Sequence, residues 1–219
     1  MTKEYQTAKI VIEPGIGEYT EKKSRFIAEV RNVETEEEAA AFVNEIKKKY
    51  WDARHNCMAF VLGESRDTMR FSDDGEPSGT AGKPILDVIL GNQIINAAIV
   101  VTRYFGGILL GTGGLVRAYQ KAAQEALENS VIAEKSSGIQ CQITTDYNGL
   151  GKIQYLSGQE GIKLLDIRYS DMVEIDMVCE VSQFAAFKKR VTDITAAKAC
   201  FEKEEPVSFY RSQNEIIII

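Results

Sequence analysis

Residues 71–119 decide how this chain folds, and they read FSDDGEPSGTAGKPILDVILGNQIINAAIVVTRYFGGILLGTGGLVRAY. Two glycine-rich loops stand out, residues 72–82 (the first loop) and residues 106–114 (the second loop). Between them, residues 94–105 are apolar on both faces, which is typical of a central strand in a sheet that is covered on both sides. The stretch therefore predicts a buried strand. One glycine-rich loop followed by a helix precedes this strand, and a second such loop and helix follow it.

Helix and strand patterns continue in both directions from this stretch. A helix is predicted after each loop, over residues 84–91 and 112–130. Upstream, residues 18–33 predict two short strands around Lys22 and Lys23. Thr35 is predicted to cap a helix that starts with three glutamates and ends with three lysines. Two further strands are expected over residues 55–62 and 68–72.

The second half of the chain has a different pattern of predicted elements, in the order strand, helix, strand, strand, helix, strand. This is the β-α-β-β-α-β order of a ferredoxin-like domain. The pattern predicts an α+β protein with two domains, residues 1–134 and 135–219, joined by a linker at residues 134–137. The isoleucine tail, residues 216–219, would promote aggregation if left exposed, so we expect it to pair or pack. The six predicted elements span residues 138–147, 148–159, 162–169, 172–181, 182–198 and 207–211.

Charge and composition narrow the class of protein. The 219 residues are 44% hydrophobic and 26% charged, as in an ordinary globular protein. No window is apolar enough to span a membrane, and residues 1–14 do not resemble a signal peptide. The net charge of −6 argues against nucleic-acid binding through bulk charge, although it leaves room for a local basic patch.

Cysteine and histidine usage excludes several kinds of site. The four cysteines are scattered without a C-x-x-C pair, which predicts reduced thiols in a cytoplasmic protein and argues against a zinc site. The single histidine, His55, would have to serve in any Ser-His-Asp or Cys-His mechanism. A metal site with several histidines cannot be built within one chain.

The second loop carries the strongest local signal for a ligand. Backbone N–H groups at a helix N-terminus bind anions, and glycine allows a ligand to approach the backbone closely. The loop matches neither a P-loop nor a dinucleotide fingerprint. The alternative is a tight loop that needs positive φ and close helix–strand packing. The candidate anion-binding residues in this loop are Gly106, Gly107, Gly111, Thr112, Gly113 and Gly114.

Two arginines flank the second loop. Arg103 ends the central strand, and Arg117 lies in the first turns of the following helix. Guanidinium groups suit phosphate, so the two side chains could converge on one anion. The alternative is an ion pair between an arginine and the carboxylates of the first loop.

The first loop has its own candidates. Asp73, Asp74 and Glu76 could hold Mg²⁺, but Asp-Asp-Gly is equally a turn sequence, and we prefer the turn. Ser78 and Lys83 could add hydroxyl and ammonium contacts to an anion. No cofactor is expected.

Arg54 and His55 open a strand and complete the set of candidate binding residues. A histidine at this place is more often a hydrogen-bonded rim residue than a catalyst. Trp51 is interpreted as a core or hinge anchor rather than as a platform for base stacking.

Several of these motifs resemble the IMPACT family, also called the YigZ family. The resemblance covers roughly residues 15–130, and the second half resembles the small C-terminal domain of bacterial members. The motifs that carry it are SRFIA at residues 24–28, ARHNC at 53–57, FSDDGEPSGTAG at 71–82, VVTRYFGG at 100–107 and LGTGGLVRAY at 110–119.

The resemblance implies a fold for each half. The first would be an α/β sandwich similar to a ribosomal small-subunit protein and to domain IV of elongation factor G. The second would be similar to domain V of that factor. Eukaryotic relatives regulate translation initiation through an additional domain that we do not recognise in this sequence.

Two functional hypotheses follow from the residues and the resemblance together. The first is a non-enzymatic module that contacts RNA, a ribosome or a translation protein through the glycine-rich anion site. The second is a phosphate-handling enzyme that binds a nucleotide or phosphometabolite with Mg²⁺ at the same loops. The residues do not fix the oligomeric state.

Overall fold

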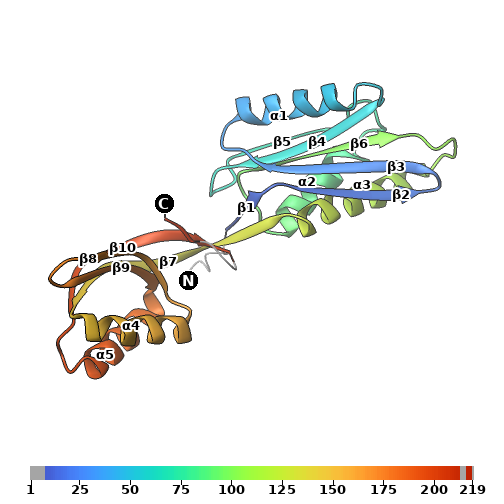
Figure 1. The fold of residues 1–219 in the computed structure, drawn as a ribbon. Coiled ribbons are helices and arrows are strands. Elements are labelled where there is room, and N and C mark those ends of the chain that lie inside the picture. Colours follow the sequence, from blue (N-terminus) through green and yellow to red (C-terminus); the bar gives the residue numbers. More distant parts are fainter. Residues whose placement is uncertain (1–7, 213–215, 219) are drawn as a thin grey trace, which may run out of the picture. The chain divides into compact units, whose positions relative to one another are not determined.

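The computed structural model describes residues 8–212 and 216–218 (Figure 1). Within these residues the chain forms five helices and two antiparallel sheets, an α+β architecture. It divides into two compact units, Met1–Glu134 and Lys135–Ile219. None of the described helices combines the length and the apolar character that a membrane crossing requires.

The N-terminal unit is built on a five-stranded antiparallel sheet in the order β2-β3-β6-β4-β5. The predicted central strand, β6, does lie in the middle, and every residue of it except Tyr104 is buried. The predicted bounds of β4 and β5 are also confirmed. A short strand, β1, pairs with the beginning of β7 outside this sheet. The bounds are β1 (Lys9–Glu13), β2 (Gly15–Glu21), β3 (Ser24–Asn32), β4 (His55–Leu62), β5 (Thr68–Ser72) and β6 (Ala97–Tyr104).

Helices cover both faces of this sheet, which explains why β6 is apolar on both sides. Helix α1 (Glu36–Lys49) lies on one face, and α2 (Gly82–Gly91) and α3 (Gly111–Glu128) lie on the other (Figure 1). Alternate residues of β6 therefore contribute to two separate cores, with Val100 under α1 and Val101 under α2 and α3. Thr35 caps α1 as predicted, because its hydroxyl accepts the N–H of Glu38 at 3.1 Å.

Three connections meet at one end of this sheet. The register pairs His55 with Arg103 and Arg25 with Tyr104, so β4 and β3 begin where β6 ends. The turn between β2 and β3, the connection from α1 to β4 and the second loop therefore share this end (Figure 1). Any candidate site residue in these connections is presented at the same end of the unit.

The C-terminal unit contains the predicted β-α-β-β-α-β order, with an additional strand at its edge. Its strands lie in the order β11-β10-β7-β9-β8, and both helices cover one face (Figure 1). Ile143, Ile175 and Phe187 belong to a core separate from those of the first unit. The bounds are β7 (Val131–Thr145), α4 (Tyr147–Glu160), β8 (Lys163–Tyr169), β9 (Val173–Glu180), α5 (Val181–Ile194), β10 (Cys200–Arg211) and β11 (Ile216–Ile218).

Two details differ from the sequence-based expectation and a third agrees with it. Residues 134–137, predicted as a linker, are part of the continuous strand β7. Helix α5 ends at Ile194, earlier than predicted, because Ala196 and Ala197 take positive φ values of 52° and 60°. The isoleucine tail pairs as expected, with Ile217 opposite Tyr210, and Ile219 lies outside the described residues.

Candidate functional site

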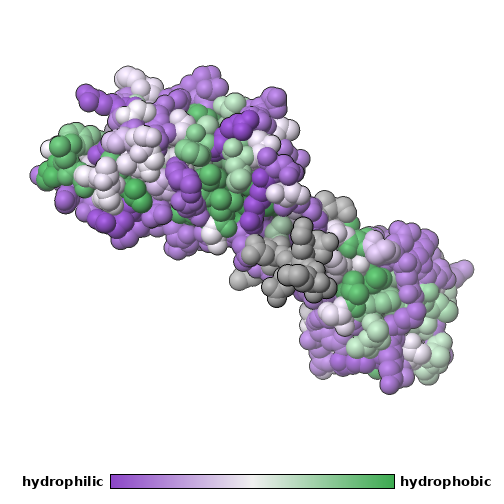
Figure 2. Space-filling model, turned by 180° about the vertical axis from the view of Figure 1, so that it is seen from behind, coloured by the Kyte–Doolittle hydropathy of each residue, from purple (hydrophilic) through white to green (hydrophobic). Residues whose placement is uncertain are grey.

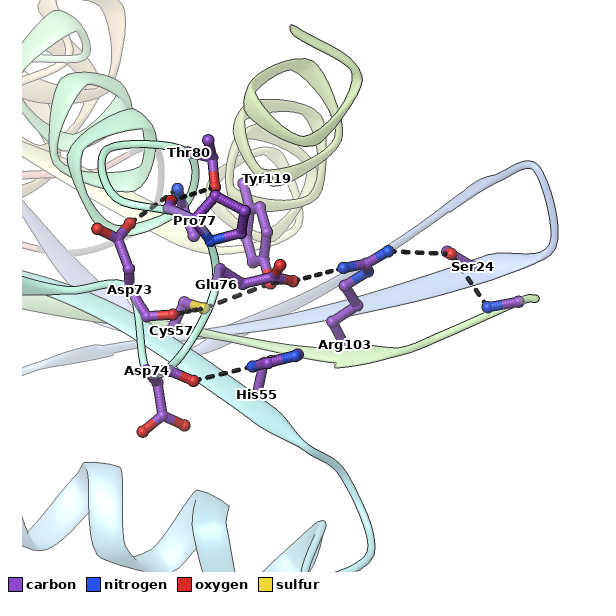
Figure 3. Close-up of polar contacts among 12 residues, drawn as sticks. Ser24, His55, Cys57, Asp73, Asp74, Glu76, Pro77, Thr80, Arg103 and Tyr119 are labelled. Atoms are coloured by element: carbon purple, nitrogen blue, oxygen red, sulfur yellow. Dashed lines mark hydrogen bonds and ion pairs between the residues drawn. The ribbon is translucent and has the colours of Figure 1, made fainter. Parts of the chain in front are cut away.

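A buried ion pair connects the first loop to the end of β6, just before the second loop (Figure 3). Arg103 Nη1 donates to Glu76 Oε1 at 2.7 Å, and the two side chains are only 7% and 4% exposed. The guanidinium also lies 5.5 Å from the ring centre of Phe26 and 5.6 Å from that of Phe105. Arg103 is therefore held inside the unit by an acidic partner from the first loop, as the ion-pair alternative expected.

Tyr119 and Cys57 extend this buried network. The Tyr119 hydroxyl donates to the same Glu76 oxygen at 2.8 Å, and Cys57 Sγ lies 3.3 Å from the Tyr119 oxygen (Figure 3). Burial raises the pKa of Cys57 and of Tyr119 above their usual ranges, and the Glu76 carboxylate adds to both shifts. Both groups stay protonated near neutral pH, so Cys57 is a structural thiol rather than a nucleophile.

Asp73 closes the N-terminus of α2. Its carboxylate accepts backbone N–H groups from Gly79 at 2.8 Å, Ala81 at 3.0 Å and Gly82 at 2.8 Å. Burial raises the pKa of Asp73, but the three N–H donors outweigh it and hold the pKa below its usual value. The first loop therefore supplies its own anion to the helix that follows it.

Asp74 is also engaged by neighbouring groups. Its carboxylate accepts the N–H of Asn56 at 2.7 Å and the ammonium of Lys47 at 3.0 Å. Its backbone oxygen lies 2.9 Å from Nδ1 of His55, whose side chain is half-buried. His55 is thus a hydrogen-bonded residue at the rim of the first loop.

The three carboxylates of the first loop do not converge on a common centre. Asp73 faces backbone amides, Asp74 faces Lys47 and Asn56, and Glu76 faces Arg103. No group of three possible metal ligands was found among the described residues. The turn interpretation of Asp73 and Asp74 accounts for these contacts without a metal.

Within the second loop, the glycines serve different purposes. A Cβ on Gly106 would lie 2.0 Å from the backbone carbon of Lys23, so only glycine allows the loop to pack against the β2–β3 turn. The N–H of Gly106 also donates to the Ser24 hydroxyl at 3.1 Å. Gly107 and Gly111 instead have open space around them and positive φ values of 84° and 69°.

The beginning of α3 is open to solvent. Leu110 is the N-cap residue, and no side chain in the described part of the chain caps the first turn. Gly111, Thr112 and Gly113 are exposed, so backbone donors of this first turn face solvent. Arg117 is exposed as well, and a Cβ on Gly113 would lie 3.6 Å from its Nη1. Arg117 forms no ion pair within the described residues, in contrast to Arg103.

The other predicted residues are spread around these two loops. Gly114 is half-buried in the first turn of α3, beside the Leu110 side chain. Ser78 and Arg54 are exposed, and Lys83 is exposed but forms an ion pair with Asp87 one turn further along α2. The structure therefore brings Gly111, Thr112, Gly113 and Arg117 together, places Arg103 beneath the second loop, and keeps Lys83 with its own partner.

Sequence reasoning missed the exposed apolar and aromatic groups at this end of the unit. Trp51 is 82% exposed, which contradicts its interpretation as a core or hinge anchor. Phe105, Ile108 and Leu109 of the second loop are also exposed, with Leu109 at 83%, and Figure 2 shows hydrophobic side chains at the left tip of this unit. The charged residues on both sides of Trp51, Lys49 and Asp52, are the signal that could have indicated its exposure.

Two family models match the chain. The Impact N-terminal domain matches residues 22–127, which include both loops and the buried network. A domain of unknown function (DUF1949) matches residues 143–198 in the C-terminal unit. The two matches fall on either side of the division between the compact units.

Individual relatives match over most of the chain. It is 39% identical to the IMPACT family member YvyE of Bacillus subtilis, covering 99% of this chain and 98% of that protein. It is 38% identical to the IMPACT family member YigZ of Escherichia coli, covering 80% and 86%. A crystal structure described as a hypothetical protein matches with a TM-score of 0.57 and 34% identity, covering 91% of this chain and 98% of that one. The resemblance seen in the sequence is thereby confirmed, and the chain belongs to the IMPACT family.

Proposed function

We propose that the protein is a non-enzymatic, translation-associated module that regulates translation by contacting RNA, free or on the ribosome, through the open start of α3. The observation that carries this proposal is the exposed first turn of α3, which no described side chain caps, beside Arg117, which has no ion-pair partner among residues 8–212 and 216–218. Backbone N–H donors, the positive end of the helix dipole and a guanidinium favour a phosphate at this place. Phosphate contacts of this kind position a protein on RNA without reading its sequence.

The net charge of the chain determines how strongly we expect it to bind RNA. The net charge of −6 opposes strong non-specific binding, so affinity should be modest and should fall steeply with salt. Arg103 contributes indirectly, because its ion pair with Glu76 fixes the end of β6 from which the second loop departs. In this proposal Arg103 positions the loop, and Arg117 with the helix amides contacts phosphate.

The proposal includes the fold assignment of each unit. We propose that the N-terminal unit corresponds to the ribosomal-protein fold of elongation factor G domain IV, and the C-terminal unit to a ferredoxin-like domain V. The strand order β10-β7-β9-β8 with both helices on one face supports the second assignment. Domains of this kind in a translation factor support an association with the cytoplasmic translation machinery.

No observation favours the alternative, a phosphate-handling enzyme with Mg²⁺. Such a site needs oxygen ligands free to hold the ion, whereas Asp73, Asp74 and Glu76 are each bound to different partners. A folded-state ligand would still be detected as a rise in melting temperature with a nucleotide and Mg²⁺.

The test is RNA binding at low and moderate salt, with a matched set of variants. Fluorescently labelled single-stranded RNA and purified ribosomes are titrated with wild type, Arg117→Ala and Gly113→Glu. Arg117→Ala should weaken binding and lower the salt slope by about 0.7, the value for one phosphate contact on a single strand. Gly113→Glu should weaken it further by placing a carboxylate where phosphate is expected.

The controls are Gly113→Gln, which adds bulk without charge, and Lys163→Ala, which removes an exposed cation from the other unit. Lys83→Ala should have a small effect because Asp87 already neutralises this side chain. The proposal fails if wild type binds neither RNA nor ribosomes at low salt. Binding to ribosomes but not to RNA would point to a translation protein as the partner.

A further inference from the structure

Trp51 is a large aromatic group held at the surface. It is the single tryptophan of the chain and is 82% exposed, in the connection between α1 and β4. Tryptophan normally buries an extensive surface, in the range of about 150–250 Å², and exposed examples are enriched at binding sites. An exposed tryptophan is therefore a candidate contact for a ligand.

The backbone on both sides of Trp51 is fixed to the unit. The N–H of Ala53 donates to the Tyr50 carbonyl at 3.1 Å, which closes a tight turn around Trp51. The Tyr50 hydroxyl donates to Glu29 at 2.8 Å, and Asp52 accepts the Tyr104 hydroxyl at 2.7 Å. The indole is thus presented from a rigid turn, which lowers the entropy cost of binding.

The charges around this turn are unbalanced in favour of cations. Lys47 and Lys49 are paired with Asp74 and Glu29, and Asp52 accepts the Tyr104 hydroxyl. Lys48 and Arg54 are exposed and form no ion pair within residues 8–212 and 216–218. Asp52 keeps its negative charge, because the tyrosine hydroxyl is neutral. The four cations Lys47, Lys48, Lys49 and Arg54 outnumber Asp74, Glu29 and Asp52 by one charge, and Lys48 and Arg54, before and after Trp51 in the chain, have no ion-pair partner among the described residues.

An exposed aromatic ring between free cations fits single-stranded nucleic acid. Bases stack on the ring, and the cations contact the backbone phosphates. A duplex would hide its base faces. Ile108 and Leu109 of the second loop are also exposed at this end of the unit, but the chain around Trp51 itself carries Lys48, Asp52 and Arg54, charged residues that suit a nucleic-acid backbone better than an apolar protein surface. We infer that Trp51 is a base-stacking subsite for single-stranded RNA, with Lys48 and Arg54 contacting the phosphates on either side.

This subsite lies at the same end of the unit as the open start of α3. The connection from α1 to β4 and the second loop both extend beyond the end of β6 (Figure 1), and the pairing of His55 with Arg103 sets this geometry. The inference rests on the proposed RNA-binding function. It adds a base contact to the phosphate contact at Arg117 and restricts the ligand to single strands.

Because Trp51 is the single tryptophan of the chain, its fluorescence reports directly on binding at this position. Unlabelled 12-nucleotide oligoadenylate is titrated into the full chain at low salt, and Trp51 fluorescence should be quenched in proportion to binding. A duplex RNA of the same length should bind without comparable quenching. In a parallel anisotropy titration with labelled oligoadenylate, Trp51→Ala should bind about tenfold more weakly, and Trp51→Phe should lie between it and wild type.

Matched variants distinguish base stacking on Trp51 from the nonspecific effect of removing an exposed aromatic side chain. Tyr155→Ala removes a comparably exposed aromatic residue from α4 in the other unit and should leave binding unchanged. Arg54→Ala should lower the salt slope by about 0.7 without abolishing quenching. The thermal midpoint of Trp51→Ala should match wild type, because the removed ring is not packed.

Each remaining outcome has a defined meaning. If oligoadenylate binds but neither quenches Trp51 nor loses affinity in Trp51→Ala, the stacking inference is overturned and the proposed function stands. If no RNA binds, both fail. If Trp51→Ala loses ribosome co-sedimentation and keeps its affinity for free RNA, the surface contacts protein and the inference is also overturned.

Discussion

Helices α2 and α3 start in similar sequences, but the N-terminus of α2 is capped by a carboxylate and that of α3 is open to solvent. Each follows a glycine-rich loop and begins with a glycine, Gly82 or Gly111. At α2, the Asp73 carboxylate lies against the backbone N–H groups of the loop and of the first helical residue. At α3, none of the described side chains caps the first turn, and the first three residues of the helix are exposed. The first loop is closed by its own anion and the second is open.

The difference shows that a glycine-rich helix start does not by itself mark a ligand site. What separates the two is a carboxylate nine positions before Gly82, which the turn at Asp74, with φ of 42°, folds back onto the helix. The arginines follow the same division, since Arg103 is paired with Glu76 and Arg117 is unpaired within the described residues. Variants that open the first loop or close the second test this comparison.

The largest expected effect on the free energy of unfolding is at the buried ion pair of the first loop, the loop that is closed by its own carboxylate. Arg103→Ala leaves the Glu76 carboxylate buried without a counter-charge, which should destabilise the unit by about 3–5 kcal/mol. Arg117→Ala, at the exposed start of α3, should change the free energy of unfolding by less than about 0.5 kcal/mol. Urea unfolding of the full chain, followed by circular dichroism, measures both.

The double variant Arg103→Met with Glu76→Leu is the control, because it removes both charges together. It should recover much of the loss seen in Arg103→Ala. Equal effects of Arg103→Ala and Arg117→Ala would contradict the division of the two arginines into a buried and an exposed one.

A smaller loss is expected when the first loop is opened. Asp73→Ala removes three hydrogen bonds from backbone N–H groups to a carboxylate and should cost about 2–3 kcal/mol. The vacated helix start should then accept an external anion. Inorganic sulfate should therefore raise the melting temperature of Asp73→Ala more than that of wild type, and an equal rise in both proteins would count against this account.

The same carboxylate predicts a pH dependence. The pKa of Asp73 is lower in the folded than in the unfolded chain, so its contribution is complete above the usual pKa of about 3.9. The contribution is lost as the pH falls through the folded value. The stability difference between wild type and Asp73→Ala should be constant from about pH 7 to pH 5 and should shrink below about pH 4. A difference that grows on acidification would contradict the depressed pKa.

The smallest effect, and the opposite sign, is expected when the second loop is closed. Gly113→Glu places a carboxylate in the first turn of α3, four residues before Arg117, where a Cβ meets only ordinary contact. Loss of glycine and the favourable dipole interaction should together stabilise the unit by about 1 kcal/mol. Gly113→Gln should keep the stabilisation that comes from replacing glycine and should lack the stabilisation that comes from the helix dipole. A destabilised Gly113→Glu would show that α3 already has a partner at this position.

Much of the fold could be predicted from the sequence because it depends on local signals. The strand patterns of β4 and β5, the Thr35 cap of α1 and the apolar run of β6 were sufficient to locate these elements. The order of elements in the C-terminal unit also followed from alternating periodicity. The linker predicted at residues 134–137 was wrong, because the polar, charged composition of these residues resembles a linker while their backbone is part of strand β7.

The site was only partly predictable, since a residue's type does not tell which partner it will meet. The sequence indicated both glycine-rich loops, both arginines and a preference for a turn at Asp73. Whether Arg103 meets a ligand or Glu76 depends on how the first loop folds back onto the end of β6. Trp51 was interpreted as a core or hinge anchor, and the structure exposes it because the turn from α1 to β4 extends past the sheet.

The sequence by itself determined the elements, the two-unit organisation of the pattern and the family signature, because these arise from short-range periodicity and contiguous motifs. The tertiary structure alone decided which helix start is closed and which arginine is buried. It also decided that the lone tryptophan faces solvent. These properties depend on contacts between residues far apart in the chain, such as Glu76 with Arg103 and Tyr50 with Glu29. Such contacts are fixed only when the sheet register brings their strands and loops together.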